Sequence, residues 1–78
     1  MANIVVFSGS HCAACDRVKA FLSNAGHTFT VRSIDEDDRA YDELLALGCR
    51  SIPVTVVGDT VITGFNPTAL TQALAKQG

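Results

Sequence analysis

Apolar residues occur along the chain in two patterns: short runs rich in β-branched residues, and longer stretches in which they recur every three or four positions. The runs predict β-strands, because β-branched and aromatic side chains pack well on a pleated sheet. The predicted strands cover residues 3–7, 28–34, 54–57 and 61–63. The stretches with helical spacing predict helices at residues 12–25, at 38–47 and from 67 onward.

Turn and cap residues support these boundaries. Asn66 followed by Pro67 is typical of a helix start, with an N-cap residue and then proline at the first helical position. Gly48 follows the second predicted helix, as a C-terminal cap commonly does. Gly58 and Asp59 separate the last two strands and predict a tight hairpin turn.

The predicted order is therefore β-α-β-α-β-β-α. A strand–helix–strand start implies a parallel, right-handed pair, and the closing hairpin adds antiparallel strands. Together they predict an α/β fold with a four-stranded mixed sheet flanked by three helices. The apolar side of the second helix is expected to contain Ala40, Tyr41, Leu44, Leu45 and Leu47.

Length and charge narrow the function. The 78 residues predict one domain, 1–78, and the net charge of −2 without a basic stripe argues against nucleic acid as a partner. With no charged leader and no apolar run long enough to cross a membrane, we expect a cytoplasmic protein without a membrane partner. We also expect a monomer. The acidic run 35–38 is interpreted as a solvated loop that leads into a helix, and the alternative is a patch that docks a partner.

Cys12 and Cys15 are the main candidates for chemistry. Two thiols three positions apart share one face of a helix, close enough to form a disulfide, and a helix N-terminus stabilises a thiolate. We expect Cys12 to attack and the more buried Cys15 to resolve. The alternatives are half of a zinc site, which lacks a second ligand pair here, and two inert semi-buried cysteines.

Other candidates surround this pair in the sequence. Pro53 at the entry to a strand is either an ordinary trans proline, which its spacing alone favours, or a cis proline that exposes the Ile52 backbone. Cys49 is a packing cysteine or a reactive third thiol. His11, next to Cys12, either tunes that thiol or only lines the loop.

Three segments together resemble the glutaredoxin-like branch of the thioredoxin superfamily, and the NrdH-type redoxins within it. These segments are Cys12-Ala13-Ala14-Cys15, Cys49-Arg50-Ser51-Ile52-Pro53-Val54 and Gly64-Phe65-Asn66-Pro67. The resemblance covers nearly the whole chain. It implies a thioredoxin-like fold and a dithiol–disulfide oxidoreductase that needs no cofactor and no metal.

The resemblance also implies roles for individual residues. Cys12 is the nucleophile, Cys15 resolves, and Pro53 is cis. The substrate-binding residues are expected to be His11, Ser51, Ile52, Pro53, Gly64, Phe65 and Asn66. Gly9 stands where glutathione-dependent glutaredoxins usually carry a basic residue that pairs with a glutathione carboxylate, and NrdH-type redoxins commonly carry a basic residue there too.

The implied substrate is a protein disulfide, with ribonucleotide reductase as the candidate and thioredoxin reductase as the electron donor. One alternative is a glutaredoxin or mycoredoxin that uses a low-molecular-weight thiol. Another, of a different class, is a non-catalytic metal or iron–sulfur binding module on the same fold.

Overall fold

The helices and strands follow one another in the predicted order. The structure, a computed structural model, describes residues 3–77. Its elements are β1 (Ile4–Ser8), α1 (Ala13–Asn24), β2 (Thr30–Ser33), α2 (Asp38–Ala46), β3 (Val54–Val57), β4 (Thr60–Thr63) and α3 (Pro67–Gln77). The largest difference from the expected boundaries is at β2, which is shorter than the 28–34 predicted for it.

The four strands form one mixed sheet in the order β2-β1-β3-β4. Strand β1 pairs in parallel with β2 and antiparallel with β3, so that Val5 lies opposite Thr30 on one side and Val56 on the other. Strands β3 and β4 form the expected hairpin, in which Val57 pairs with Thr60 across a two-residue turn. The mixed sheet predicted from the sequence is confirmed.

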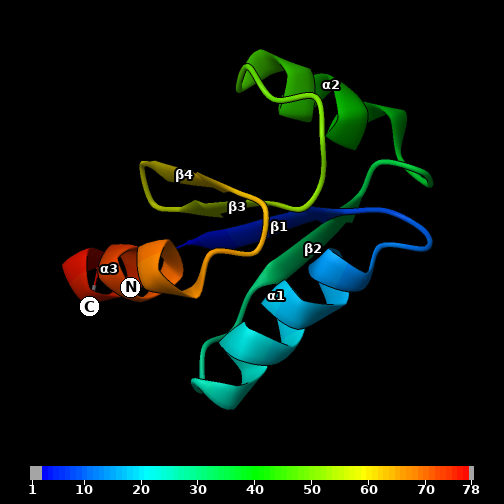
Figure 1. The fold of residues 1–78 in the computed structure, drawn as a ribbon. Coiled ribbons are helices and arrows are strands. Elements are labelled where there is room, and N and C mark those ends of the chain that lie inside the picture. Colours follow the sequence, from blue (N-terminus) through cyan, green and yellow to red (C-terminus); the bar gives the residue numbers. More distant parts are fainter. Residues whose placement is uncertain (1–2, 78) are drawn as a thin grey trace.

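Helices cover both faces of this sheet. Figure 1 shows α1 and α3 on one face and α2 on the opposite face. The core under α1 and α3 is made of Ile4, Val6, Val18, Leu22, Val57, Ile62, Leu70 and Ala73. The smaller core under α2 is made of Phe7, Ala40, Leu44 and Val54.

Helix α2 uses a narrower apolar face than the sequence suggested. Ala40 and Leu44 are fully buried, whereas Tyr41, Leu45 and Leu47 are each at least 40% exposed. This nine-residue helix buries about one residue per turn against the sheet, so the neighbouring apolar side chains remain in solvent. The expectation that all five residues form the packed side is wrong.

The acidic run before α2 divides between two roles. Asp37 is the N-cap of α2, and its carboxylate accepts a hydrogen bond from the Arg39 amide at 2.9 Å. Asp35 turns instead toward the loop between β1 and α1, where its carboxylate accepts a hydrogen bond from the Ser10 amide. The run therefore leads into a helix as expected, but one member contacts a segment 25 residues earlier.

Candidate functional site

The two thiols of the Cys-X-X-Cys segment lie at the start of α1. Cys12 is the N-cap residue, with extended backbone angles of φ −114° and ψ 99°, and its Sγ accepts a hydrogen bond from the Cys15 amide at 3.1 Å. The two sulfurs are joined in a disulfide, and the Cα atoms are 5.2 Å apart. Cys15 is fully buried, while Cys12 is half-buried.

This geometry gives the two sulfurs different chemistry. The N-terminus of a helix carries unpaired amide N–H groups and a partial positive charge, and both stabilise a thiolate. The Cys12 sulfur accepts a hydrogen bond from one of these amides and is also the sulfur that solvent reaches. Cys15 lies one turn into the helix on the same buried face as Val18 and Leu22.

The segment that enters β3 carries the cis proline. The Ile52–Pro53 peptide bond is cis, so the trans form favoured by spacing alone is wrong and the form implied by the family resemblance is confirmed. Pro53 is buried directly before β3, and its carbonyl accepts a hydrogen bond from the Gly64 amide at 2.9 Å. That bond joins two of the segments that the sequence singled out. Ser51 lies exposed just before them.

The residues after Gly64 connect β4 to α3. Gly64 has φ +70°, which favours glycine, and the chain then turns into the last helix. Asn66 is the cap expected there, because its side chain accepts a hydrogen bond from the Ala69 amide at 3.1 Å. Phe65 is 37% exposed and packs edge-on against Phe21 of α1, with ring centroids 6.3 Å apart. An aromatic ring thus bridges the helix of the dithiol and the start of α3.

The loop that precedes Cys12 is held in a specific conformation. His11 is exposed and has a positive φ of 56°, an uncommon value for a residue with a side chain. Gly9 is closely packed: a Cβ atom there would lie 2.7 Å from Ile52 Cδ1 and 3.2 Å from Asp35 Oδ2. Gly9 therefore fits between the residue before the cis proline and the Asp35 carboxylate.

Asp35 is a residue of this region that the sequence reasoning missed. Hydrogen bonds from the Ser10 backbone and side chain hold the pKa of the Asp35 carboxyl below its ordinary value, and the nearby His11 charge acts in the same direction. No local motif marks this contact. The signal that could have found it is topological, because β1 and β2 are parallel and the loops after both strands must leave from the same edge of the sheet.

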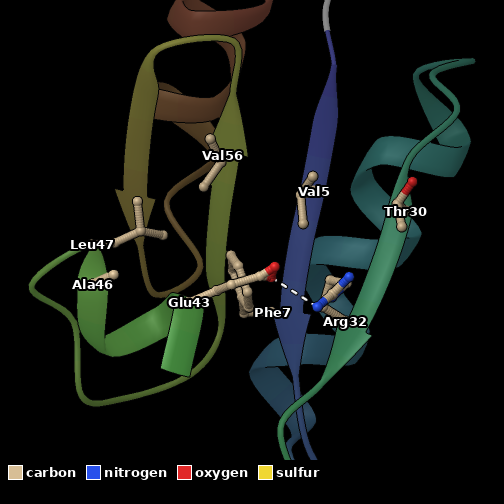
Figure 2. A pocket seen from close by; sticks show the side chains of 8 residues that line it. All are labelled: Val5, Phe7, Thr30, Arg32, Glu43, Ala46, Leu47 and Val56. Atoms are coloured by element: carbon tan, nitrogen blue, oxygen red, sulfur yellow. Dashed lines mark ion pairs between the residues drawn. The ribbon is translucent and has the colours of Figure 1, made fainter. Parts of the chain in front are cut away.

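Two further features lie apart from the dithiol. Cys49 is not disulfide-bonded and packs half-buried against the core under α2, which fits the structural alternative. An open hollow of about 410 Å³ lies between α2 and the sheet, and Figure 2 shows Arg32 and Glu43 paired beside it. It is lined by Val5, Phe7, Thr30, Arg32, Glu43, Ala46, Leu47 and Val56.

Within residues 3–77, no group of three or more His, Cys, Asp or Glu side chains is arranged to hold a metal ion. Every helix in that same range falls short of the length and apolar character that a bilayer-crossing segment requires.

Comparisons with known proteins agree with this arrangement. A family model described as Glutaredoxin matches residues 4–62. The glutaredoxin-like protein NrdH of Escherichia coli (strain K12) is 31% identical over 65 residues, which are 83% of this chain and 80% of that protein. The glutaredoxin-like protein NrdH of Lactococcus lactis subsp. cremoris (strain MG1363) is 31% identical over 67 residues, which are 86% of this chain and 93% of that protein.

A solved structure leads to the same family. The NrdH-redoxin from Escherichia coli, described as a glutaredoxin-like protein with a thioredoxin-like activity profile, superposes with a TM-score of 0.83 at 28% identity. The superposition covers 90% of this chain and 92% of that one. Because the family match runs from β1 into β4 and the NrdH relatives align over most of both chains, this protein belongs to the glutaredoxin family of thiol–disulfide oxidoreductases and is similar to the NrdH redoxins.

Proposed function

We propose that this protein reduces disulfides of other proteins, with Cys12 as the nucleophile and Cys15 as the resolving thiol. The observation that carries the proposal is the asymmetry of the pair: Cys12 caps α1 and is reachable, whereas Cys15 is fully buried. A thiolate attacks a disulfide from an accessible, electropositive position, and a shielded thiol then acts within the same molecule.

The reaction transfers two electrons in two exchange steps. The Cys12 thiolate attacks one sulfur of the substrate disulfide, a mixed disulfide forms, and the other substrate sulfur leaves as a thiolate that takes up a proton. Cys15 loses its proton and attacks the Cys12 sulfur, so the second substrate sulfur leaves and the Cys12–Cys15 disulfide remains. A reductase then supplies two electrons to restore the dithiol.

The substrate chain is proposed to lie between the cis-proline segment and the segment before α3. Ser51 and Ile52 would offer backbone groups to an extended peptide beside Pro53, and Gly64 to Asn66 would line the other side, with His11 at the dithiol end. The hydrogen bond between the Gly64 amide and the Pro53 carbonyl supports one continuous surface. The exposed ring of Phe65 gives that surface an apolar contact.

The proposed partners are a ribonucleotide reductase as the substrate and thioredoxin reductase as the electron donor. Similarity to proteins called NrdH, and to a structure described as having a thioredoxin-like activity profile, supports this choice. The protein is proposed to work in the cytoplasm, where a dithiol is kept reduced between turnovers. It is proposed to act as a monomer that consists of one domain.

A small-thiol donor is the competing proposal, and the surroundings of Gly9 argue against it. Glutathione-dependent relatives usually carry a basic side chain at this position. Here any side chain would meet Ile52 and Asp35, and the Asp35 carboxylate adds a negative charge beside the place where a glutathione carboxylate would bind. We therefore expect poor turnover with glutathione.

The test compares both regenerating systems in one disulfide-reduction assay. NADPH with thioredoxin reductase should support turnover, while NADPH, glutathione reductase and glutathione should support little. The Cys12→Ser variant should be inactive, and Cys15→Ser should accumulate a mixed disulfide at Cys12 that mass spectrometry detects. Full activity of Cys12→Ser would contradict the nucleophile assignment, and efficient turnover with glutathione would favour the small-thiol alternative.

A further inference from the structure

The loop between β1 and α1 positions Cys12. The side chains of this loop are mostly in solvent and do little to fix its conformation. Ser10 and His11 are exposed, and His11 adopts the left-handed region at φ 56°. For a residue with a Cβ atom this conformation is strained, so it persists where surrounding contacts impose it. A contact from outside the loop supports this conformation.

The contact comes from the loop that follows β2. The Asp35 carboxylate accepts a hydrogen bond from the Ser10 amide, one residue before His11 and two before Cys12. Charge-assisted hydrogen bonds of this type are roughly twice as strong as neutral ones. Asp35 thus restrains the backbone of the loop at Ser10, just before the chain turns into α1.

Asp35 is itself fixed in place. The amide of the preceding Ile34 donates to the Ser8 carbonyl at 2.9 Å, a backbone hydrogen bond that lies just beyond the last strand pair, Ser8 and Ser33. Gly9 leaves the space that the carboxylate occupies, since a Cβ there would come within 3.2 Å of Asp35 Oδ2. The sheet therefore fixes the backbone next to Asp35, and this places the Asp35 carboxylate beside the loop.

We propose that Asp35 is a positioning residue for the dithiol: by accepting the Ser10 amide hydrogen bond, it holds the turn through His11 in the form in which Cys12 caps α1. This inference rests on the proposed role of Cys12 as the nucleophile. Without the contact, the turn relaxes, the Cys12 sulfur leaves the amide groups at the helix N-terminus, and its thiolate loses their stabilisation.

Charge and geometry act in opposite directions, and this makes the proposal testable. A carboxylate near a thiolate disfavours the thiolate, so loss of the Asp35 charge alone should favour it. Loss of the hydrogen-bond acceptor should disfavour it. Asp35→Asn removes the charge and keeps an acceptor oxygen, whereas Asp35→Ala removes both. Glu36→Ala, a change at the exposed neighbouring acid, is the matched control.

The readout is the rate at which iodoacetamide alkylates Cys12 in the reduced protein, followed as a function of pH by mass spectrometry of the Cys12 peptide. In Asp35→Ala we expect the pH midpoint to rise by about half a unit or more, which lowers the rate below that midpoint by roughly threefold. In Asp35→Asn the midpoint should stay or fall, and Glu36→Ala should match the parent. A midpoint in Asp35→Ala that is unchanged, or that falls as in Asp35→Asn, would overturn the proposal.

A second measurement covers the case in which Asp35→Ala does not fold. In the unsubstituted protein, the NMR resonance of the Ser10 amide should shift as the Asp35 carboxyl titrates, and a Ser10 resonance insensitive to that titration would overturn the proposal. The assignment of Cys12 fails separately: it is contradicted if the parent protein is alkylated first at Cys15, whatever the Asp35 variants do.

Discussion

At the scale of single residues, Asp35 links folding stability to pH. The hydrogen bonds from Ser10 lower the pKa of its carboxyl in the folded state relative to the unfolded chain. A lowered folded-state pKa means that the charged form stabilises the fold. This contribution is fully present above the unfolded-state pKa and disappears as the pH falls through the folded-state pKa.

We therefore expect the stability difference between the parent protein and Asp35→Asn to depend on pH. The parent should be more stable at neutral pH, and the difference should shrink as the pH falls through the folded-state pKa of Asp35. Denaturant unfolding of both proteins across the acid range measures it, and the other carboxyl groups cancel in the comparison. A difference that is constant with pH would contradict the role of the ionised carboxylate.

The residue scale also separates what the sequence could predict from what it could not. The position of Cys12 at a helix N-terminus and of Cys15 as its more buried partner follow from their spacing and from the apolar residues that continue the helix, although Cys12 is the N-cap and not the first helical residue. The cis form of Pro53 does not follow from spacing, because the trans form is the more common one for an isolated X–Pro bond. The contact of Asp35 with Ser10 spans 25 positions and leaves no local pattern.

At the scale of elements, α2 offers a matched pair of leucines. Leu44 is fully buried against the sheet, and Leu45 beside it is 41% exposed. We expect Leu44→Ala to lower the free energy of unfolding by about 2–5 kcal/mol, because it removes buried apolar area and leaves a cavity. Leu45→Ala should change it by less than about 1 kcal/mol. Chemical denaturation measures both, and equal losses would contradict the packing described for α2.

Strand β3 contains a buried hydroxyl group that is expected to lower the free energy of unfolding. Thr55 is fully buried, and within residues 3–77 its Oγ1 has no hydrogen-bond partner. A buried polar group without a partner costs about 1–3 kcal/mol, so Thr55→Val should raise the free energy of unfolding by about 1 kcal/mol or more. Thr63→Val, at an exposed position of β4, is the control and should change little. Destabilisation by Thr55→Val would indicate that the hydroxyl is satisfied in solution.

The elements themselves were mostly predictable, and the exceptions have physical causes. β3 matches residues 54–57 because its apolar run is bounded by Pro53 and Gly58. β2 is shorter than expected because parallel pairing with β1 extends only from Thr30 to Ser33, whatever the β-propensity of Phe29. The exposed side chains of α2 reflect the narrow contact of one short helix with a sheet, which periodicity alone does not reveal.

At the scale of the whole molecule, the two layers of helices are not equally anchored. Helix α1 contributes Val18 and Leu22 to the core that it shares with α3, whereas α2 contributes Ala40 and Leu44 to a smaller one. The open hollow of about 410 Å³ separates part of α2 from the sheet. Arg32 on β2 reaches Glu43 of α2 at 2.8 Å and the α2 cap Asp37 at 3.6 Å, but these groups are partly exposed.

Partly exposed ion pairs contribute little, about 0–1 kcal/mol each, so they do not compensate for the smaller apolar contact. We therefore expect α2 to open before the rest of the molecule unfolds. Native-state amide hydrogen exchange should give the buried α2 amides a lower opening free energy than those of α1, and Leu44→Ala should lower it further. Val18→Ala should instead lower the opening free energy throughout the molecule, because it weakens the core on which global stability depends. Identical opening free energies for α1 and α2 would mean that the two layers unfold as one unit and that the ion pairs of Arg32 hold α2 more firmly than their exposure suggests.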